Sequence, residues 1–299
     1  MRGLWAVLKD AWNTYLNHDG SLHSGALAFY ALLSIAPLAV IAVGVAGFFL
    51  GEVTASETFD AQVETWLGDT KAASFIEELV AKQEEIVGSG IALYLSGAFV
   101  IWAGLRVFLM LRASLNHVWG IRVATPLGFR GLRGRVLLRR LASIAMLPVV
   151  GASIIVLAVL KATLSAVEEY VSRIPFAFQL LEATVSIALL TLLVALVYKL
   201  LPDARIHWRD ALVGGLATSV LASIGAYLIG LYLAYVGPAS LYGAAGSLVV
   251  LLLWVYYMAQ IFFFGANVTA AYAKHHGHGI EPLPHATRVV LADETHPGP

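Results

Sequence analysis

The sequence predicts an all-α integral membrane protein: a bundle of six transmembrane helices with an N-terminal interfacial helix and a small helical external cap. Its residues are 59% hydrophobic and 13% charged, whereas a soluble domain has roughly 45–50% apolar and about 25% charged residues. A bilayer core about 30 Å thick takes roughly 20 apolar residues as helix, and six runs of this kind occur. The basic residues also gather in alternate connections between these runs, as expected for a multi-pass protein.

Residues 1–24 predict an amphipathic helix on the cytoplasmic surface. Large apolar side chains recur at helical spacing, with Lys9, Asp10 and Asn13 between them; they are Leu4, Trp5, Leu8, Trp12, Tyr15 and Leu16. Trp and Tyr favour the headgroup region of a membrane. We therefore expect this helix to lie on the inner leaflet with its aromatic rings at headgroup depth.

The membrane domain is predicted over residues 25–272. Its spans are expected at about 25–50, 90–112, 136–160, 176–200, 211–236 and 240–272. The last run is longer than a bilayer requires, so it should tilt or emerge from the membrane. Between the first two spans, residues 52–87 read as helical but are too polar to enter lipid, and they form the predicted external cap.

The distribution of Lys and Arg predicts the orientation. One side carries most of the basic residues, which are Arg2, Lys9, Arg122, Arg130, Arg133, Arg135, Arg139, Arg140, Lys199, Arg205, Arg209, Lys274 and Arg288. The opposite side has only Lys71, Lys82, Lys161 and Arg173, beside an acidic loop. Both termini are therefore predicted to be cytoplasmic. Residues 273–299, rich in proline, glycine and charge, predict a flexible cytoplasmic tail.

The sequence predicts neither an enzyme nor a cofactor or metal site. It has no cysteine, and no GxSxG, HExxH, Walker A or GxGxxG motif stands in a strand–helix context. The histidines His275, His276, His278 and His285 fall in the predicted tail, where they favour only adventitious metal binding. The basic loop LGFRGLRGRVLLRR at 127–140 lies beside a span, so we expect it to bind anionic lipid headgroups rather than nucleic acid.

Polar side chains within the spans supply the candidate functional residues. Gln260 and Asn267 are seven residues apart on one face of the last span, and other spans carry similar polar faces. The candidates for lining a path or joining helices are Tyr30, Ser34, Pro37, Arg106, Glu182, Ser223, Tyr257, Gln260 and Asn267. Two interpretations stay open: the polar faces line a central cavity or groove, or they hydrogen-bond between helices, at about 0.6 kcal/mol per bond.

Several of these candidates have simpler explanations. Arg106 lies near the inner end of its span and can extend to the cytoplasmic headgroups, while Glu182 lies near the outer end of another span, within reach of water or of a structural hydrogen bond. Pro37 removes a backbone hydrogen bond and should kink the first span. The small residues Gly214 and Gly215 predict close contact between helices.

Three segments together resemble the YihY family, also called virulence factor BrkB. They are SGALAFYALLSIAPLAV at 24–40, LPDARIHWRDALVGG at 201–215 and YGAAGSLVVLLLWVYYMAQIFFFGANVTA at 242–270. The resemblance implies a six-helix protein of the bacterial inner membrane, for which transport of a lipid or other amphiphile is one proposal. It also implies a relation to members that are linked to serum resistance and virulence. In the family an acid usually follows Gly-Ala of the last span, whereas this chain has Asn267.

The leading hypothesis is a membrane protein that moves or exposes a lipid or other amphiphile across the membrane. The alternatives are an envelope scaffold that does not transport, and an exporter of small solutes. An older label for the family, ribonuclease BN, implies tRNA processing, but the chain lacks the clustered His and Asp ligands of such a metallo-nuclease, and we reject it. Membrane lipids are the expected partners, while a homo-oligomer and a partner for the external cap are left open.

Overall fold

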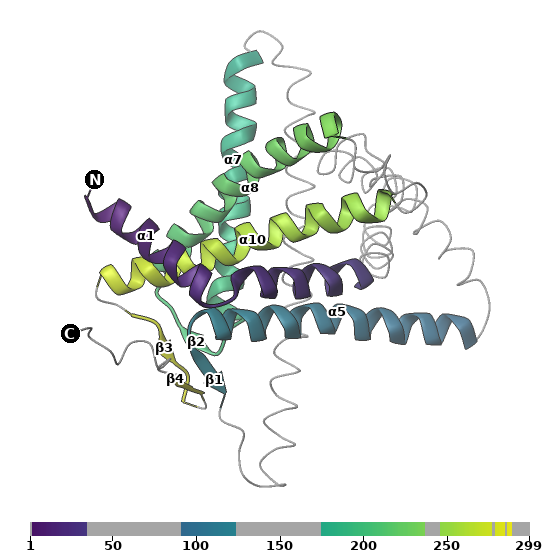
Figure 1. Cartoon of the computed structure of the whole chain (residues 1–299), viewed down its shortest axis with the longest axis horizontal. Coiled ribbons are helices and arrows are strands. Elements are labelled where there is room, and N and C mark those ends of the chain that lie inside the picture. Colours follow the sequence, from purple (N-terminus) through teal and green to yellow (C-terminus); the bar gives the residue numbers. More distant parts are fainter. Residues whose placement is uncertain are drawn as a thin grey trace, which may run out of the picture.

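The computed structural model describes residues 2–34, 91–123, 175–236, 246–276, 279–284 and 286–288. The chain begins with α1 (Arg2–Asn17) and, after a turn, a helix over residues 20–34. The long helices are α5 (Ile91–Val118), α7 (Pro175–Leu200), α8 (Trp208–Val236) and α10 (Gly246–His275). The short strands are β1 (Ile121–Val123), β2 (Ala204–Arg205), β3 (Glu281–Pro282) and β4 (Ala286–Arg288). Figure 1 shows their arrangement.

Three described helices are long and apolar enough to cross a membrane, over Ala183–Leu200, Trp208–Tyr232 and Leu248–His275. They correspond to the predicted fourth, fifth and sixth spans, and α5 covers the predicted second span. On α8, large apolar side chains stay exposed at every fourth position, namely Leu212, Leu216, Val220, Ile224 and Leu228. Such a continuous apolar stripe suits contact with lipid. Most of the predicted first span lies outside the described residues, and so do the whole third span and the whole external cap. The count of six spans therefore stays a prediction.

Helices α8 and α10 lie side by side (Figure 1), and small residues allow their close approach. A Cβ on Gly214 of α8 would overlap the hydroxyl of Thr269, and a Cβ on Gly265 of α10 would overlap the hydroxyl of Thr218. Each helix therefore contributes a glycine and, four residues later, a threonine, and the two pairs interlock in opposite directions. This reciprocal packing uses small residues as membrane helices commonly do.

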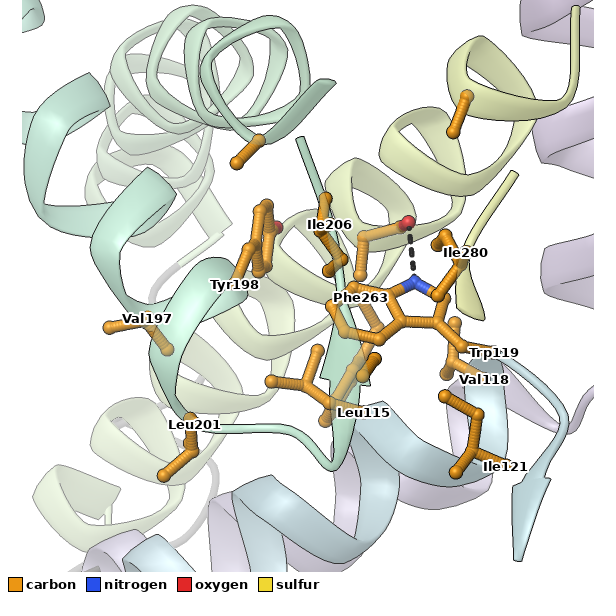
Figure 2. Packing of buried hydrophobic residues seen from close by; sticks show 14 of the residues in the cluster. Leu115, Val118, Trp119, Ile121, Val197, Tyr198, Leu201, Ile206, Phe263 and Ile280 are labelled. Atoms are coloured by element: carbon orange, nitrogen blue, oxygen red, sulfur yellow. Dashed lines mark hydrogen bonds between the residues drawn. The ribbon is translucent and has the colours of Figure 1, made fainter. Parts of the chain in front are cut away.

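The buried core lies at one end of the bundle, which we call the base: there the C-terminal ends of α5, α7 and α10 meet the N-terminal end of α8 (Figure 1). Figure 2 shows Leu115, Trp119, Tyr198, Ile206 and Phe263 converging from these elements. The indole nitrogen of Trp119 donates to the Ala266 carbonyl at 3.0 Å (Figure 2). Tyr198 is fully buried, and its hydroxyl contacts the Phe262 carbonyl at 2.6 Å and the Thr218 hydroxyl at 2.9 Å.

The flexible tail predicted from residue 273 does not begin there. Helix α10 continues to His275, and the chain beyond it forms two short antiparallel ladders, β3 with β2 and β4 with β1. Ile280 and Ala286 are buried in the core of the base. The prediction was wrong for this part because the composition is typical of disorder, whereas the backbone pairs with strands distant in sequence and buries its few apolar side chains.

Helix α1 crosses α10 at the base (Figure 1). Its buried face contains Val7 and Ala11, packed with Val268 and Ala271 of α10. Tyr15 continues this face at the next turn and is only 8% exposed, so its ring is packed against the protein, while its depth in the membrane stays a prediction. The other aromatic face points outward: Trp5, Trp12 and Leu16 are 72%, 55% and 57% exposed. This division suits a helix that is attached to the bundle on one side and meets a membrane surface on the other.

Candidate functional site at the base of the bundle

A buried ion pair joins α5 to the connection between α7 and α8. Arg112 makes a bidentate contact with Asp203, Nη2 donating to Oδ1 at 2.7 Å and Nε to Oδ2 at 3.1 Å. The Asn116 amide donates to Oδ2 at 2.9 Å and accepts the backbone N–H of Asp203 at 2.8 Å. The side chains of Arg112 and Asp203 are 14% and 2% exposed. Among the described residues this ion pair is well shielded from solvent, in contrast to the exposed contact between His275 and Asp10.

The local fold explains how these groups meet. Arg112 and Asn116 are four residues apart on α5, so their side chains share one face of the helix. Asp203 follows the end of α7 in a short connection to β2. The tail fixes that connection as well, because the backbone N–H of Leu283 donates to the Asp203 carbonyl at 3.0 Å. Two segments that are distant in sequence therefore converge on Asp203, with α5 contacting its carboxylate and the tail contacting its backbone carbonyl.

Sequence reasoning missed this cluster. Asp203 stands outside the apolar runs, where an acid is normally solvated, and Arg112 stands at the edge of its predicted span, where it resembles an ordinary basic flank. The sequence signal for this cluster is Asp203 directly after Pro202 in LPDAR. That segment had been interpreted only through its resemblance to the family. Such a buried and fully hydrogen-bonded pair supplies no nucleophile, and its chemistry is that of a specific connection between segments.

A second polar group lies where the 20–34 helix contacts α5. His23 Nδ1 and Ser114 Oγ are 3.2 Å apart and hydrogen-bonded. The rings of His23 and His117 are 4.6 Å apart between centroids, and those of His18 and His117 are 6.3 Å apart. Phe263 of α10 flanks His23 at 6.3 Å. Because His18 and His117 were not among the predicted site residues, this histidine group is also new from the structure.

The pKa of His23 is lowered, chiefly by burial and then by the neighbouring His117, while Asp19 acts in the opposite direction. The unfolded chain therefore binds more protons than the folded protein once the pH falls below the ordinary histidine pKa of about 6.5. Stability should be complete above that value and should decrease as the pH falls through it.

We expect His23→Gln to reduce this loss of stability. The melting temperature of the wild type in detergent should drop between about pH 7.5 and about pH 5.5, and the drop should be smaller in the variant. His276→Gln is the matched control, since His276, which directly follows α10, is exposed and stacks on Tyr272. Equal drops in the wild type and in His23→Gln would contradict the assignment.

Asn267 is the predicted candidate that the structure places most deeply. It is 1% exposed, and its amide Nδ2 donates to the Phe263 carbonyl of its own helix at 2.8 Å. Its Oδ1 is buried and has no hydrogen-bond partner within the described part of the chain. Gln260, two turns earlier, is half-buried. A buried amide oxygen without a donor is rare and costs roughly 1–3 kcal/mol.

The remaining candidates do not gather around Asn267. Arg106 is exposed and lies over the Trp102 ring at 5.3 Å. Tyr30 is half-buried and contacts Phe29, while Tyr257 packs against Gly225 of α8. Ser34 is fully buried and Ser223 is exposed. Pro37 lies outside the described residues, as does the side chain of Glu182, whose backbone belongs to α7.

Most hydroxyl groups within the helices bond to their own helix. Ser34 donates to the Ala31 carbonyl at 3.0 Å and Ser223 to the Ser219 carbonyl at 2.9 Å. The same pattern occurs at Thr184, Thr191, Ser219 and Thr269. These hydroxyls are therefore satisfied without a neighbouring helix and without water. Polar contacts between different segments, by contrast, gather at the base.

The described residues contain no group of three or more His, Asp or Glu side chains placed to hold a metal ion. His275, from the histidine cluster of the sequence, instead pairs with Asp10, Nε2 to Oδ2 at 2.9 Å. This contact joins the end of α10 to α1 at the surface. It adds to the buried contacts by which the first helix is attached to the bundle.

Comparison with known proteins gives relatives that are named only as membrane proteins. The chain is 26% identical over 297 residues to a UPF0761 membrane protein of Rhodospirillum centenum, covering 96% of this chain and 63% of that protein. It is 28% identical over 257 residues to one of Verminephrobacter eiseniae, covering 83% and 58%, and 27% identical over 320 residues to one of Albidiferax ferrireducens, covering 98% and 71%.

The chain thus spans about three fifths of the length of the first two relatives. No solved structure matches it. The model of the family described as virulence factor BrkB matches residues 11–289, a range that includes α10 with Asn267, the ion pair of Arg112 and Asp203, and the histidine group. The chain therefore belongs to the virulence factor BrkB family of membrane proteins.

Proposed function

We propose that this protein moves or exposes a lipid, or another amphiphile, between the two leaflets of the bacterial inner membrane. The single observation that carries the proposal is the buried Oδ1 of Asn267, which has no donor among the described residues. A polar atom in this state is stabilised when a passing headgroup or an accompanying water donates a hydrogen bond to it. Gln260 on the same helix extends the polar stripe.

The outer face of α1 supports the proposal. Trp5 and Trp12 are exposed on a helix whose opposite face is packed on α10. If these rings lie among inner-leaflet headgroups, α1 would hold the lipid surface next to the segment of α10 that contains Asn267. A protein that receives a lipid from this leaflet needs such an attachment.

A non-transporting scaffold is the alternative, and the base favours it. The Arg112–Asp203 pair, the Trp119–Ala266 bond and the interlocked glycines all hold the bundle in one arrangement. In that case Asn267 would be only an imperfectly satisfied structural residue. The two proposed functions predict different effects on lipid scrambling when the Asn267 amide is removed.

The test is scrambling of a fluorescent phospholipid in vesicles that contain the purified protein, compared with protein-free vesicles. Asn267→Leu has nearly the same volume and removes the unpaired oxygen, so we expect it to leave the fold intact or stabilise it by about 1 kcal/mol. We expect the same variant to slow scrambling. Lower activity together with unchanged or higher stability is the signature of a functional residue.

Thr184→Ala is the matched control, because Thr184 is exposed and its hydroxyl is satisfied within α7. It should leave scrambling unchanged. Adding Gln260→Leu to Asn267→Leu should slow scrambling further if both amides belong to one path. The absence of scrambling by the folded wild-type protein would argue against lipid movement and in favour of the scaffold or of a solute exporter.

A further inference from the structure

The histidine group at the base is built from three segments. His18 lies in the turn after α1, His23 in the 20–34 helix and His117 near the end of α5. The close pair is His23 and His117, whose ring centroids are 4.6 Å apart, and Ser114 is hydrogen-bonded to His23. His23 is half-buried, whereas His117 is exposed, so the group is reached from outside along His117.

The described neighbours of His23 come from three elements. Asp19 acts on His23 from the turn, Ser114 and His117 face it from α5, and α10 contributes the apolar ring of Phe263. The neighbouring His117 makes a charge on His23 less favourable. An anion in contact with the edges of both rings would offset this penalty, and a protonated imidazole would supply N–H donors to it.

The chemistry of the group selects the kind of anion. A phosphate presents several strong acceptor oxygens in a tetrahedral arrangement, which matches donors that come from separate segments. A carboxylate has two oxygens in one plane and suits a single planar donor such as the arginine fork. Metal coordination is a poorer explanation, since these imidazoles are not placed as a metal-binding set within the described chain.

We propose that His18, His23 and His117, with the hydroxyl of Ser114, bind a phosphate group at the base of the bundle. This inference deepens the proposed function and rests on it for the source of the ligand, a phospholipid headgroup. The site lies on the end of the bundle that carries α1, with its exposed Trp5 and Trp12, and tryptophan favours the headgroup region of a membrane. Free phosphate has the same chemistry and is the other source.

The experiment uses the full chain in a phosphate-free detergent, with its histidines isotopically labelled and their imidazole resonances recorded by NMR. Inorganic phosphate, short-chain phosphatidylglycerol and a phosphate-free diacylglycerol are titrated separately at constant ionic strength. We expect the resonances of His23 and His117 to shift with either phosphate compound, and those of His276 to stay unchanged. The diacylglycerol should leave all of them unchanged.

His117→Gln should weaken phosphate binding about tenfold or more, the effect of removing one charge-assisted donor. Its exposed position makes it a safe variant for folding, and His23→Gln provides a second, buried test. The matched control His276→Gln should bind as the wild type does. Because binding is measured in detergent without vesicles, its result is independent of whether the protein scrambles lipids.

Tighter binding of phosphatidylglycerol than of inorganic phosphate would identify the headgroup as the source. Equal or tighter binding of inorganic phosphate would support the site and assign it to the free anion. If neither His23 nor His117 responds, or if His276 responds equally, the proposed site is wrong. Binding that persists unchanged in both glutamine variants would also overturn it.

Discussion

Gly265→Ala is expected to destabilise the bundle by about 1–3 kcal/mol, the usual cost of overpacking. The new methyl group would collide with the hydroxyl of Thr218, and the Tyr198 hydroxyl lies 2.9 Å from the same position. Thr218 cannot rotate freely, because it is β-branched and its hydroxyl is bonded to Gly214 and to Tyr198. Relief therefore requires α8 and α10 to separate, which would weaken every contact between them.

The measurement is reversible unfolding in mixed detergent micelles, followed by circular dichroism. Gly230→Ala in α8 is the matched control, since a Cβ there meets no described atom within 4 Å, and it should be neutral or stabilising by up to about 1 kcal/mol. Thr218→Ala combined with Gly265→Ala should recover part of the loss by removing the colliding hydroxyl. If the double variant is no better than Gly265→Ala, the collision does not cause the loss.

Hydropathy was sufficient to predict the three described helices that are long and apolar enough to cross a membrane. The predicted spans 176–200 and 211–236 compare with α7 at Pro175–Leu200 and α8 at Trp208–Val236. The extra residues at the start of α8 include Arg209 and Asp210, whose charges ended the apolar run although the helix had already begun. In the last predicted span, α10 is described from Gly246 and continues to His275, while the predicted start at 240 lies outside the described residues.

The candidate site was harder to predict, because its contacts are not local in the sequence. The glycines Gly214 and Gly215 were expected to mark close helix packing, and the structure supplies their partners, Thr269 on α10 and the backbone of Thr191 on α7. Periodicity correctly indicated that Asn267 faces protein, since it is buried. It could not indicate that the side chain bonds to its own helix, a choice made by local geometry rather than by spacing.

The contacts at the base were not predicted for a related reason. Arg112 and Asp203 are separated by 91 residues, and each has an ordinary explanation when it is considered alone. Strands β3 and β4 are two and three residues long, too short for a period-2 pattern to be recognised. Their pairing with β1 and β2 depends on the earlier helices having brought those partners to the same end of the bundle.

Arg112→Ala is expected to cost about 3–5 kcal/mol, the largest loss of stability predicted here for a single substitution. It removes the guanidinium from the Asp203 carboxylate, which is only 2% exposed, while the hydrogen bond from the Asn116 amide remains. The effect should reach the tail, because the backbone of Asp203 also holds Leu283. The measurement is unfolding in mixed micelles, together with limited proteolysis of the segment around residues 279–288.

Arg106→Ala is the control for this experiment. Arg106 lies on the same helix but is exposed, and its contact with Trp102 is worth about 0.5–1 kcal/mol. A loss for Arg112→Ala no larger than this would show that the buried pair contributes little. Equal cleavage of the tail in both variants would show that Asp203 does not connect α5 to the tail.

The double variant Arg112→Met/Asp203→Asn tests whether the protein needs the two charges themselves or only the contact between α5 and the segment after α7. Removing both charges should recover much of the loss, since a buried pair is only weakly stabilising relative to a neutral pair of similar size. Asn still offers an acceptor to Asn116, so the link to α5 is kept. If the double variant is stable but its phospholipid scrambling is slower than in the wild type, the ion pair serves movement rather than folding. If stability and scrambling both recover, the base is a fixed support on which the helices carrying His23 and Asn267 are held, and the moving parts lie elsewhere in the bundle.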